Sequence, residues 1–411
     1  MAARPKILLF STLYPSGARP GHGIFVATRL RQLVASGEID AKVVAPVPWF
    51  CSTNPRFGEY ARMALTPKHE TLDGIEVWHP RYLLPPKVGM SAAPFAMALG
   101  AVRTLRRLIA NGFDFDVIDA HYYYPDGVAA ALLARHFNKP FVVTARGSDV
   151  NLIAKYAVPR RLMQWAARCA DTSIAVSEAL GSAMLDMGMP PQRIKVLRNG
   201  VDLTRFQSLP QATARAQLGW PDAPTLIAVG NLVENKGQHL ALEALALLPG
   251  FRLYLAGSGP EADALQALAR RLGVAERVLF CGRVAQEHLS VYYSAADILV
   301  LPSSREGSPN VVLESMACGT PVVATPVGGI PEFVRGPLAG RLITDRSAAQ
   351  LVNAVQDLWA QGIDRAAVRR HASRFDWDDT TRGQLDIFSR LALANSARHL
   401  SNPAGTDRRP A

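Results

Sequence analysis

The sequence is poor in cysteine and has no long apolar run. Its four cysteines, Cys51, Cys169, Cys281 and Cys318, are widely separated in a chain of 411 residues. Because zinc sites need closely spaced cysteines and secreted scaffolds need many of them, both classes are excluded and a reducing compartment is indicated. No stretch approaches the roughly 18 uninterrupted apolar residues of a membrane span. The first apolar run, at residues 6–10, reads as a strand and is too short for a signal peptide. We therefore expect a cytoplasmic protein.

An excess of acidic charge is also absent. The chain has 45 Lys and Arg against 34 Asp and Glu, a formal charge of +11. Residues 1–200 hold 24 basic and 14 acidic side chains, and residues 201–411 hold 21 and 20, so ten of the eleven excess charges belong to the first half. Such asymmetry favours an anionic surface or substrate for that half, although a merely basic surface accounts for it equally well. We expect no nucleic-acid partner.

Short apolar runs alternate with helical patterns in both halves of the chain. This alternation predicts an α/β fold with two Rossmann-like, doubly wound parallel-sheet domains facing each other across a cleft. We place the first domain at residues 1–200, the second at 201–375, a C-terminal helix that can pack back on the first domain at 376–398, and a disordered tail at 399–411. The strands are expected at residues 6–12, 41–47, 75–79, 115–120, 141–145, 172–176, 226–229, 251–256, 278–281, 297–303 and 321–325.

Two carboxylates flank the start of a short helix in the second half. The run REGSPNVVLESMACGTPVV begins at Arg305 and includes Glu306 and Glu314. Ser308 is a suitable N-cap and Pro309 suits the first helical position, so the helix is expected to begin there. Apolar runs on both sides make this a strand–loop–helix–strand unit. In such units the loop after the strand carries the ligand, and the helix N-terminus favours an anion such as phosphate.

The order of motifs resembles the retaining glycosyltransferases of family 4, which have the two-lobed GT-B fold. The resemblance covers the chain to about residue 397, and its most specific part is the pair Glu306 and Glu314, separated by seven residues. The other matching segments are Gly328-Gly-Ile-Pro-Glu, Val229-Gly-Asn-Leu-Val-Glu-Asn-Lys-Gly, Leu255-Ala-Gly-Ser-Gly-Pro-Glu, Asn199-Gly-Val-Asp, Gly21-His-Gly, His121 after its strand, and Thr144-Ala-Arg-Gly-Ser-Asp.

The resemblance implies a transfer of sugar from a nucleotide-sugar donor to a hydroxyl acceptor, with no cofactor and no metal. By this resemblance Glu306 contacts the donor sugar, Glu314 contacts the nucleotide ribose, and Lys236 neutralises the diphosphate. His121, Glu306 and Lys236 are then the catalytic candidates. The donor-binding candidates are Gly21, Gly23, Asn231, Lys236, Glu306, Gly307, Ser308, Asn310, Val311 and Glu314.

Two positions depart from the family pattern. Asn231 stands where relatives usually have an arginine, so the second phosphate contact is in question, and Arg198 or Arg283 are candidates to supply the cation. Arg146 stands where many relatives have histidine, and with Asp149 it is a candidate to face the donor or the acceptor.

Three readings of function stay open at this stage. The first is a retaining glycosyltransferase whose acceptor is a lipid-linked or cell-envelope or exopolysaccharide glycan. The second is a nucleotide-sugar epimerase or hydrolase on the same scaffold, and the third is a catalytically silent nucleotide-sugar-binding protein.

Two basic amphipathic segments of the first domain bear on whether the protein binds the cytoplasmic membrane. If they contact anionic lipid, the protein is peripheral at the inner face of the cytoplasmic membrane; if they merely cover the sheet, their arginines are solvated. They contain Arg103, Arg106 and Arg107, and Lys155, Arg160, Arg161 and Arg168.

Overall fold

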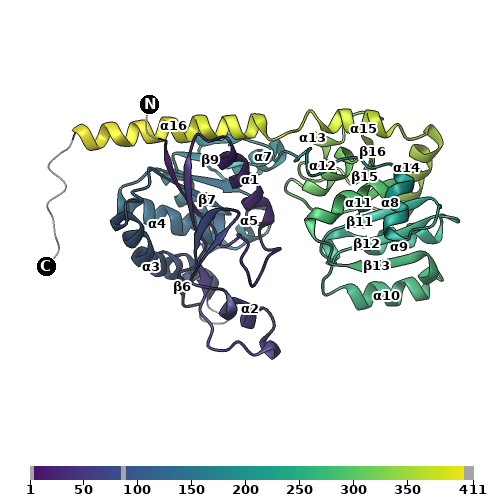
Figure 1. The fold of residues 1–411 in the computed structure, drawn as a ribbon, viewed down its shortest axis with the longest axis horizontal. Helices are drawn as coiled ribbons and strands as arrows, with labels where there is room; N and C mark the ends of the chain where they lie inside the picture. The colour runs from purple at the N-terminus through teal and green to yellow at the C-terminus, as the bar shows by residue number, and fades with distance from the viewer. Residues whose placement is uncertain (1–3, 85–88, 402–411) are drawn as a thin grey trace. The chain divides into compact units, whose positions relative to one another are not determined.

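The computed structural model describes residues 4–84 and 89–401, which form two compact units (Figure 1). The first unit contains the chain up to Arg198 together with the residues from Asp379 onward, and the second runs from Asn199 to Asp378. The chain therefore passes from one unit to the other twice. In the described ranges no helix is both long enough and apolar enough to span a bilayer.

The first unit is built on an eight-stranded sheet in the order β10-β9-β8-β7-β1-β2-β5-β4. All neighbouring strands are parallel except β4, which is antiparallel to β5. The strands are β1 (Lys6–Phe10), β2 (Asp40–Val44), β4 (His69–Leu72), β5 (Ile75–Trp78), β7 (Val117–His121), β8 (Phe141–Ala145), β9 (Thr172–Ala175) and β10 (Ile194–Val196). A separate two-stranded pair consists of β3 (Val47–Pro48) and β6 (Arg81–Tyr82).

Helices cover both faces of this sheet because its strands are apolar on both sides. On one face α3, α4 and α6 pack against residues such as Leu8 and Phe10, and on the other α1 and the last helix pack against Ile7 and Leu9. The helices of the first unit are α1 (Ile24–Ala35), α2 (Glu59–Leu65), α3 (Gly89–Ala110), α4 (Val128–Phe137), α5 (Ser148–Asn151), α6 (Ala157–Cys169), α7 (Glu178–Asp186) and α16 (Asp378–Ser401).

The last helix, α16, belongs to the first unit although the second unit precedes it in the chain. Its buried residues Leu385, Phe388 and Leu391 share a core cluster with strand residues of the eight-stranded sheet. The Thr380 hydroxyl donates to the backbone carbonyl of Arg198. The helix begins at Asp378, within the segment assigned to it, and extends to Ser401, so residues 399–401 are helical where we predicted a disordered tail. The rest of that tail, from residue 402, lies outside the described residues.

The second unit is a six-stranded parallel sheet in the order β13-β12-β11-β14-β15-β16. Its strands are β11 (Thr225–Val229), β12 (Arg252–Ala256), β13 (Val278–Gly282), β14 (Ile298–Leu301), β15 (Val322–Ala324) and β16 (Gly340–Leu342). One face is covered by α8 (Gln211–Leu218), α11 (Leu289–Ala295), α12 (Asn310–Ala317) and α15 (Arg365–Ala372). The other is covered by α9 (Gln238–Ala246), α10 (Ala262–Arg271) and α14 (Ala348–Gln361), and the short α13 (Ile330–Phe333) precedes β16.

Candidate active site

The loop after β14 leads into α12 one residue later than expected. Pro309 is the capping residue, because its extended backbone (φ −75°, ψ 110°) keeps it out of the helix, and Asn310 is the first helical residue. Our assignment of Ser308 as N-cap is therefore wrong. The Ser308 hydroxyl is buried and has no partner in the part of the chain that the structure describes. The first backbone N–H groups of α12, on Asn310 and Val311, have no acceptor within the helix. This end of the loop thus offers several donors to an anion.

Glu306 is held in place by two donors. Its Oε1 accepts from Lys236 Nζ at 2.6 Å and from Ser303 Oγ at 2.7 Å, and its side chain is 9% exposed. A solvated loop acid would show neither the burial nor the ordered partners. Gly237, next to Lys236, has φ 73°, and a Cβ there would lie 2.2 Å from the carbonyl oxygen of Pro302. Glycine is therefore needed for the loops after β11 and β14 to approach and bring Lys236 to Glu306.

Glu314 is buried within α12 and has partners from two other segments. Its Oε2 accepts from the Tyr293 hydroxyl at 3.0 Å. Burial raises the pKa of Glu314 to about 7, while hydrogen bonds from Tyr293 and Gln286 and the charge of Arg205 act to lower it. Gln286 in turn accepts from Arg205 Nη1 at 2.9 Å. Arg205, Gln286 and Tyr293 were missed by the sequence analysis, although Arg205 follows the Asn199-Gly-Val-Asp segment that carries part of the resemblance.

Glycine-rich loops at the carboxyl ends of the strands pack backbone against backbone. A Cβ on Gly257 would lie 1.8 Å from the carbonyl oxygen of Gly230. A Cβ on Gly328 would lie 2.2 Å from the carbonyl oxygen of Glu306, and the next residue, Gly329, donates its N–H to Gly307 at 2.8 Å. These glycines fix the positions of the site loops, because any side chain there would clash with the neighbouring backbone.

Asn231 and Arg283 lie at the surface of the second unit, whereas Arg198 lies in the first. Asn231 is exposed beyond β11, and its backbone carbonyl accepts from Gln238 Nε2 at 3.0 Å. Arg283 is exposed after β13. Arg198 belongs to the first unit, where it pairs with Glu178 at 2.9 Å. That either arginine replaces a cation at position 231 stays a prediction.

His121 is the last residue of β7 and its imidazole is almost wholly buried. Nδ1 lies 2.6 Å from Arg146 Nη2 and Nε2 lies 3.0 Å from Asp119 Oδ2. Because a guanidinium can only donate, Nδ1 is the acceptor and Nε2 carries the proton that is donated to Asp119. Burial lowers the pKa of His121 to about 4 against the opposing effect of Asp119, so the ring is neutral at physiological pH. In this arrangement both ring nitrogens are engaged by protein side chains and the ring orients Arg146, while a catalytic role of His121 stays a prediction.

Arg146 and Asp149 have different roles in the loop after β8. The guanidinium of Arg146 lies over the ring of Phe25, with 5.1 Å to its centroid, and burial lowers the pKa of Arg146 to about 9. Asp149 is fully buried, and its carboxylate accepts from the backbone N–H groups of Tyr123, Arg146 and Gly147. Asp149 therefore shapes the loop and does not face a donor or an acceptor as we had expected.

The support of His121 extends to residues far away in the chain. Asp119 Oδ2 also accepts from Gln384 Nε2 on α16 at 3.0 Å, and Gln384 Oε1 accepts from Arg29 Nε on α1 at 2.6 Å. All three side chains are buried. This network was not predicted from the sequence, because no local pattern joins residues on α1, β7 and α16.

The Gly21-His-Gly loop follows β1 and precedes α1. Gly23 has φ 66°, and a Cβ there would lie 2.3 Å from the carbonyl of Leu13, so the local backbone alone requires glycine. Gly21 lies in the preceding turn, and between them His22 Nε2 contacts the carbonyl of Thr12 at 3.0 Å. Thr12 in turn hydrogen-bonds to the buried Asp126 beyond β7. The structure thus brings this loop to the same sheet edge as His121, and its contact with a donor stays a prediction.

Comparison with known proteins decides the family. A family model described as "Glycosyl transferases group 1" matches residues 210–375, and one described as "Glycosyltransferase Family 4" matches residues 21–205. The chain is 31% identical over 356 residues to TuaC of Bacillus subtilis, named as a teichuronic acid biosynthesis glycosyltransferase, with 85% of this chain and 88% of the relative covered. The chain belongs to the family 4 glycosyltransferases. This glycosyltransferase is also 35% identical over 308 residues to the D-inositol 3-phosphate glycosyltransferase of Acidothermus cellulolyticus, which covers 68% of each chain.

Solved structures show the fold of this glycosyltransferase. The sucrose-phosphate synthase of Thermosynechococcus elongatus superposes with a TM-score of 0.77 at 23% identity and covers 95% of this chain and 100% of that one. HepE of Anabaena, in complex with UDP-glucose, gives 0.71 at 22% identity, with 94% and 100% covered. The fold is GT-B, which confirms the fold class predicted from the motifs.

Proposed function

We propose that this glycosyltransferase moves a sugar from a nucleotide-sugar donor to an acceptor hydroxyl and retains the anomeric configuration. The observation that carries the proposal is the pair of buried carboxylates around the start of α12, Glu306 beside Lys236 and Glu314 beside Tyr293. A nucleotide sugar has hydroxyl groups at both ends and a diphosphate between them. Carboxylates bind such hydroxyls through charge-assisted hydrogen bonds, and a helix N-terminus with a lysine suits the diphosphate.

The chemistry proposed for the site needs no covalent enzyme intermediate. The bond between the anomeric carbon and the diphosphate oxygen breaks, and the acceptor oxygen bonds to the same face of that carbon. The acceptor proton passes to the departing phosphate. Lys236 and the free N–H groups of Asn310 and Val311 stabilise the negative charge that grows on the diphosphate, a task that metal ions perform in other enzymes. Activity is therefore proposed to be independent of metal.

Product analysis tests this proposal against the two other readings. Purified protein is incubated with a panel of nucleotide sugars and glycan or lipid-linked acceptors in excess EDTA, and the products are identified by NMR. We expect sugar transfer with the anomeric configuration of the donor. Free sugar or an epimerised donor as the main product would favour the hydrolase or epimerase, and donor binding without any turnover would favour the silent binding protein.

Nucleotide binding is expected to depend on pH through Glu314. The pKa of Glu314 is about 7, so the charged form is lost as the pH falls through 7 and nucleoside diphosphate affinity falls with it. The Tyr293 hydroxyl stabilises the charged form, so Tyr293→Phe should move the midpoint to higher pH and weaken binding at pH 7 by about 1–2 kcal/mol. Calorimetry between about pH 5.5 and 8.5 measures both.

The matched control for this prediction is the neighbouring tyrosine. Tyr292 packs edge-to-face on Trp220, whereas the tyrosine hydroxyl that donates to Glu314 is that of Tyr293. Tyr292→Phe should keep the wild-type pH profile. Identical profiles for Tyr293→Phe and wild type would show that Glu314 does not bind the nucleotide.

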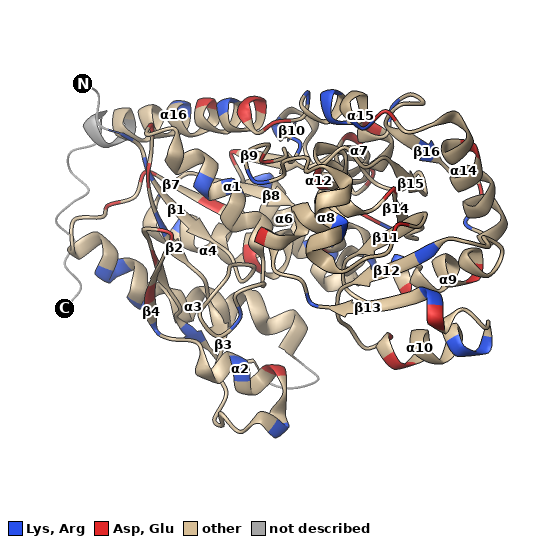
Figure 2. Cartoon of the chain, turned by 45° about the vertical axis from the view of Figure 1, so that its right-hand side comes forward, with Lys and Arg blue, Asp and Glu red and all other residues tan. Residues whose placement is uncertain are grey.

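For the acceptor we propose a lipid-linked or cell-envelope glycan reached at the inner face of the cytoplasmic membrane. TuaC, the relative named for teichuronic acid biosynthesis, supports a cell-envelope product. The first unit supports the surface: on α3, Phe95 is 50% and Leu99 is 79% exposed, and Arg103 follows one turn later. Figure 2 shows basic residues on α3. At the start of α6, Tyr156 is exposed next to basic residues.

Vesicle flotation tests the membrane contact. We expect binding to anionic vesicles at low salt that is weakened by salt, since each cation near an anionic surface contributes about 1 kcal/mol. Replacing both Phe95 and Leu99 with Ser should reduce the bound fraction severalfold, because it removes the apolar groups that insert. Leu247→Ser, at a similarly exposed leucine of the second unit, is the control and should bind like wild type. No preference for anionic vesicles at low salt would favour a soluble acceptor.

A further inference from the structure

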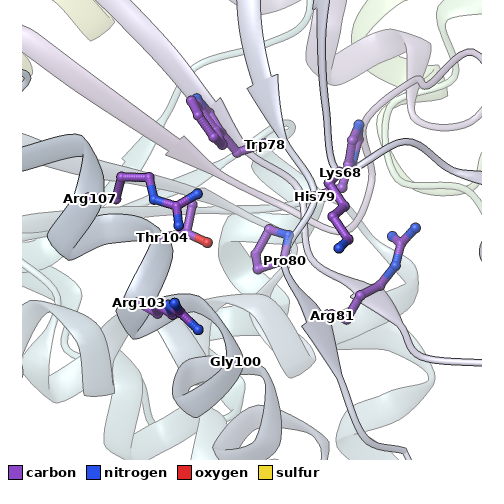
Figure 3. A pocket seen from close by; sticks show the side chains of 9 residues that line it. All are labelled: Lys68, Trp78, His79, Pro80, Arg81, Gly100, Arg103, Thr104 and Arg107. Atoms are coloured by element: carbon purple, nitrogen blue, oxygen red, sulfur yellow. The ribbon is translucent and has the colours of Figure 1, made fainter. Parts of the chain in front are cut away.

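A strongly basic pocket lies in the first unit between α3 and the segment that joins β5 to β6. Its volume is about 460 Å³. Figure 3 shows Arg103, Thr104 and Arg107 projecting from α3, with Trp78 and Arg81 on the strand side. Lys68, just before β4, also lines it. None of the described residues lining this basic pocket carries a carboxylate, so four cations meet there without a counter-charge.

The cations of the basic pocket are not used elsewhere in the described chain. No ion pair or side-chain hydrogen bond engages Lys68, Arg103 or Arg107 in residues 4–84 and 89–401. Arg81 donates through Nη2 to the carbonyl of Thr66, but its Nη1 is buried and has no partner. The indole N–H of Trp78 is likewise buried and unpartnered.

Nearby acids are committed to other groups. Glu70 accepts from the backbone N–H of Gly17 at 3.0 Å and contacts His79 Nε2 at 2.8 Å. Glu76 pairs with Lys42 and lies 3.5 Å from His69. The positive charge of the basic pocket is therefore not cancelled by its surroundings, and Arg81 with its unpaired Nη1 is left to be satisfied by a ligand.

We propose that the basic pocket binds a phosphate-bearing group with at least two negative charges, such as a diphosphate. One guanidinium is enough to pair with a single carboxylate. Here Arg103 and Arg107, one turn apart on α3, provide two guanidinium groups, and Arg81 and Lys68 add two more cations, which suits a ligand with several negative charges. The volume exceeds that of a diphosphate, which leaves room for a sugar attached to it. This inference rests on the proposed function in one respect, namely that the ligand is the phosphorylated end of the acceptor.

Calorimetry with inorganic pyrophosphate tests the pocket directly. The full chain carrying Lys236→Ala is used, so that the diphosphate-binding lysine of the second unit does not contribute. In that background the double variant Arg103→Ser, Arg107→Ser is expected to weaken pyrophosphate binding at least tenfold, because two charge-assisted contacts are lost. Arg106→Ser is the matched control: Arg106 is on the same helix but contacts His136 Nε2 at 3.2 Å and does not line the pocket. It should bind pyrophosphate like its parent.

The outcomes separate the pocket from general charge effects and from the proposed function. Equal pyrophosphate affinity in the double variant and its parent overturns the site, and so does an equal fall in Arg106→Ser. Arg103 and Arg107 are exposed, so both variants should keep the melting temperature of the parent. Without the Lys236 change, the double variant should also keep its affinity for nucleoside diphosphate, which is bound in the second unit. A wild-type protein that transfers no sugar would end the proposed function and leave the pyrophosphate result unaffected.

A second arm identifies the source of the phosphate. If the group is carried on a lipid, the double variant loses more binding to phosphatidic acid vesicles than to phosphatidylserine vesicles, because the loss of two cations weakens binding to any anionic surface and the loss of the site weakens only the first. If the group is carried on a soluble acceptor, the double variant loses binding to both vesicle types to the same extent. Either result supports a phosphate site once pyrophosphate binding has been shown to need Arg103 and Arg107.

Discussion

Glu306→Ala is expected to lower turnover by roughly 10²–10³-fold, the usual effect of removing one preorganised contact to the reacting group. The affinity for nucleoside diphosphate, which lacks the sugar, should not fall. Lys236 Nζ now pairs with Glu306 at 2.6 Å, so removing the carboxylate frees the ammonium for the diphosphate and keeps or raises that affinity. Steady-state rates at saturating donor and acceptor, together with calorimetry, measure the two effects separately.

Glu306→Gln serves as the control for shape. It can still accept from the Ser303 hydroxyl but has no charge to hold Lys236, so it should retain more activity than the alanine variant. A loss of nucleoside diphosphate affinity as large as the loss of turnover would place Glu306 at the nucleotide end of the donor and contradict our assignment.

His121→Ala is expected to reduce turnover by about tenfold to a hundredfold and to lower the melting temperature by a few degrees. Without the imidazole, Arg146 loses one acceptor and Asp119 loses one donor in a buried site, which costs about 1–3 kcal/mol. We expect Arg146 to shift as a result, which should disturb the donor or acceptor contact that we predict for this residue. Donor affinity should stay close to that of the wild type.

The pH profile separates this positioning role from acid–base catalysis. Because the pKa of His121 is lowered to about 4, its titration should not appear in the wild-type rate profile at neutral pH. Asp119→Asn, which keeps a polar partner for Nε2 but changes the tautomer it favours, should lower turnover without adding a titration near pH 6.5. A limb near pH 6.5 that His121→Ala abolishes would show instead that the imidazole transfers a proton.

The sheets were predictable because their central strands are buried on both faces. Such strands appear as short apolar runs, and β8 and β12 lie within one residue of the ranges expected for them. The antiparallel β4 was missed because its sequence, His-Glu-Thr-Leu, is only partly buried and has no apolar run. The capping error at Ser308 has a similar origin: propensity favours serine as N-cap and proline as the next residue, but Pro309 adopts an extended conformation that the sequence does not reveal.

The candidate site was predictable where its residues are close in the chain. Glu306 and Glu314 belong to one loop and helix, so their spacing alone marks them. Arg205, Gln286 and Tyr293 meet Glu314 only because separate elements fold together, and no spacing indicates this. Asp149 shows the opposite error: it lies in a family motif, yet its carboxylate accepts from the backbone of its own loop and from the backbone of Tyr123 after β7.

Because α16 packs on the first unit, the two units are expected to complete their folding in a fixed order during synthesis. Synthesis proceeds from the N-terminus, and domains usually fold as their residues emerge. All residues of the second unit precede Asp379, so that unit can close while the first still lacks Gln384 and the apolar side chain of Phe388. Until α16 emerges, its apolar residues cannot pack on Ile7, Val142 and Ile174. The carboxylate of Asp119 likewise lacks the hydrogen bond from the side-chain amide of Gln384. The lobe whose strands are made first is therefore the last to be completed, and a nascent chain arrested before α16 would present an open apolar sheet face to the chaperones of the cell.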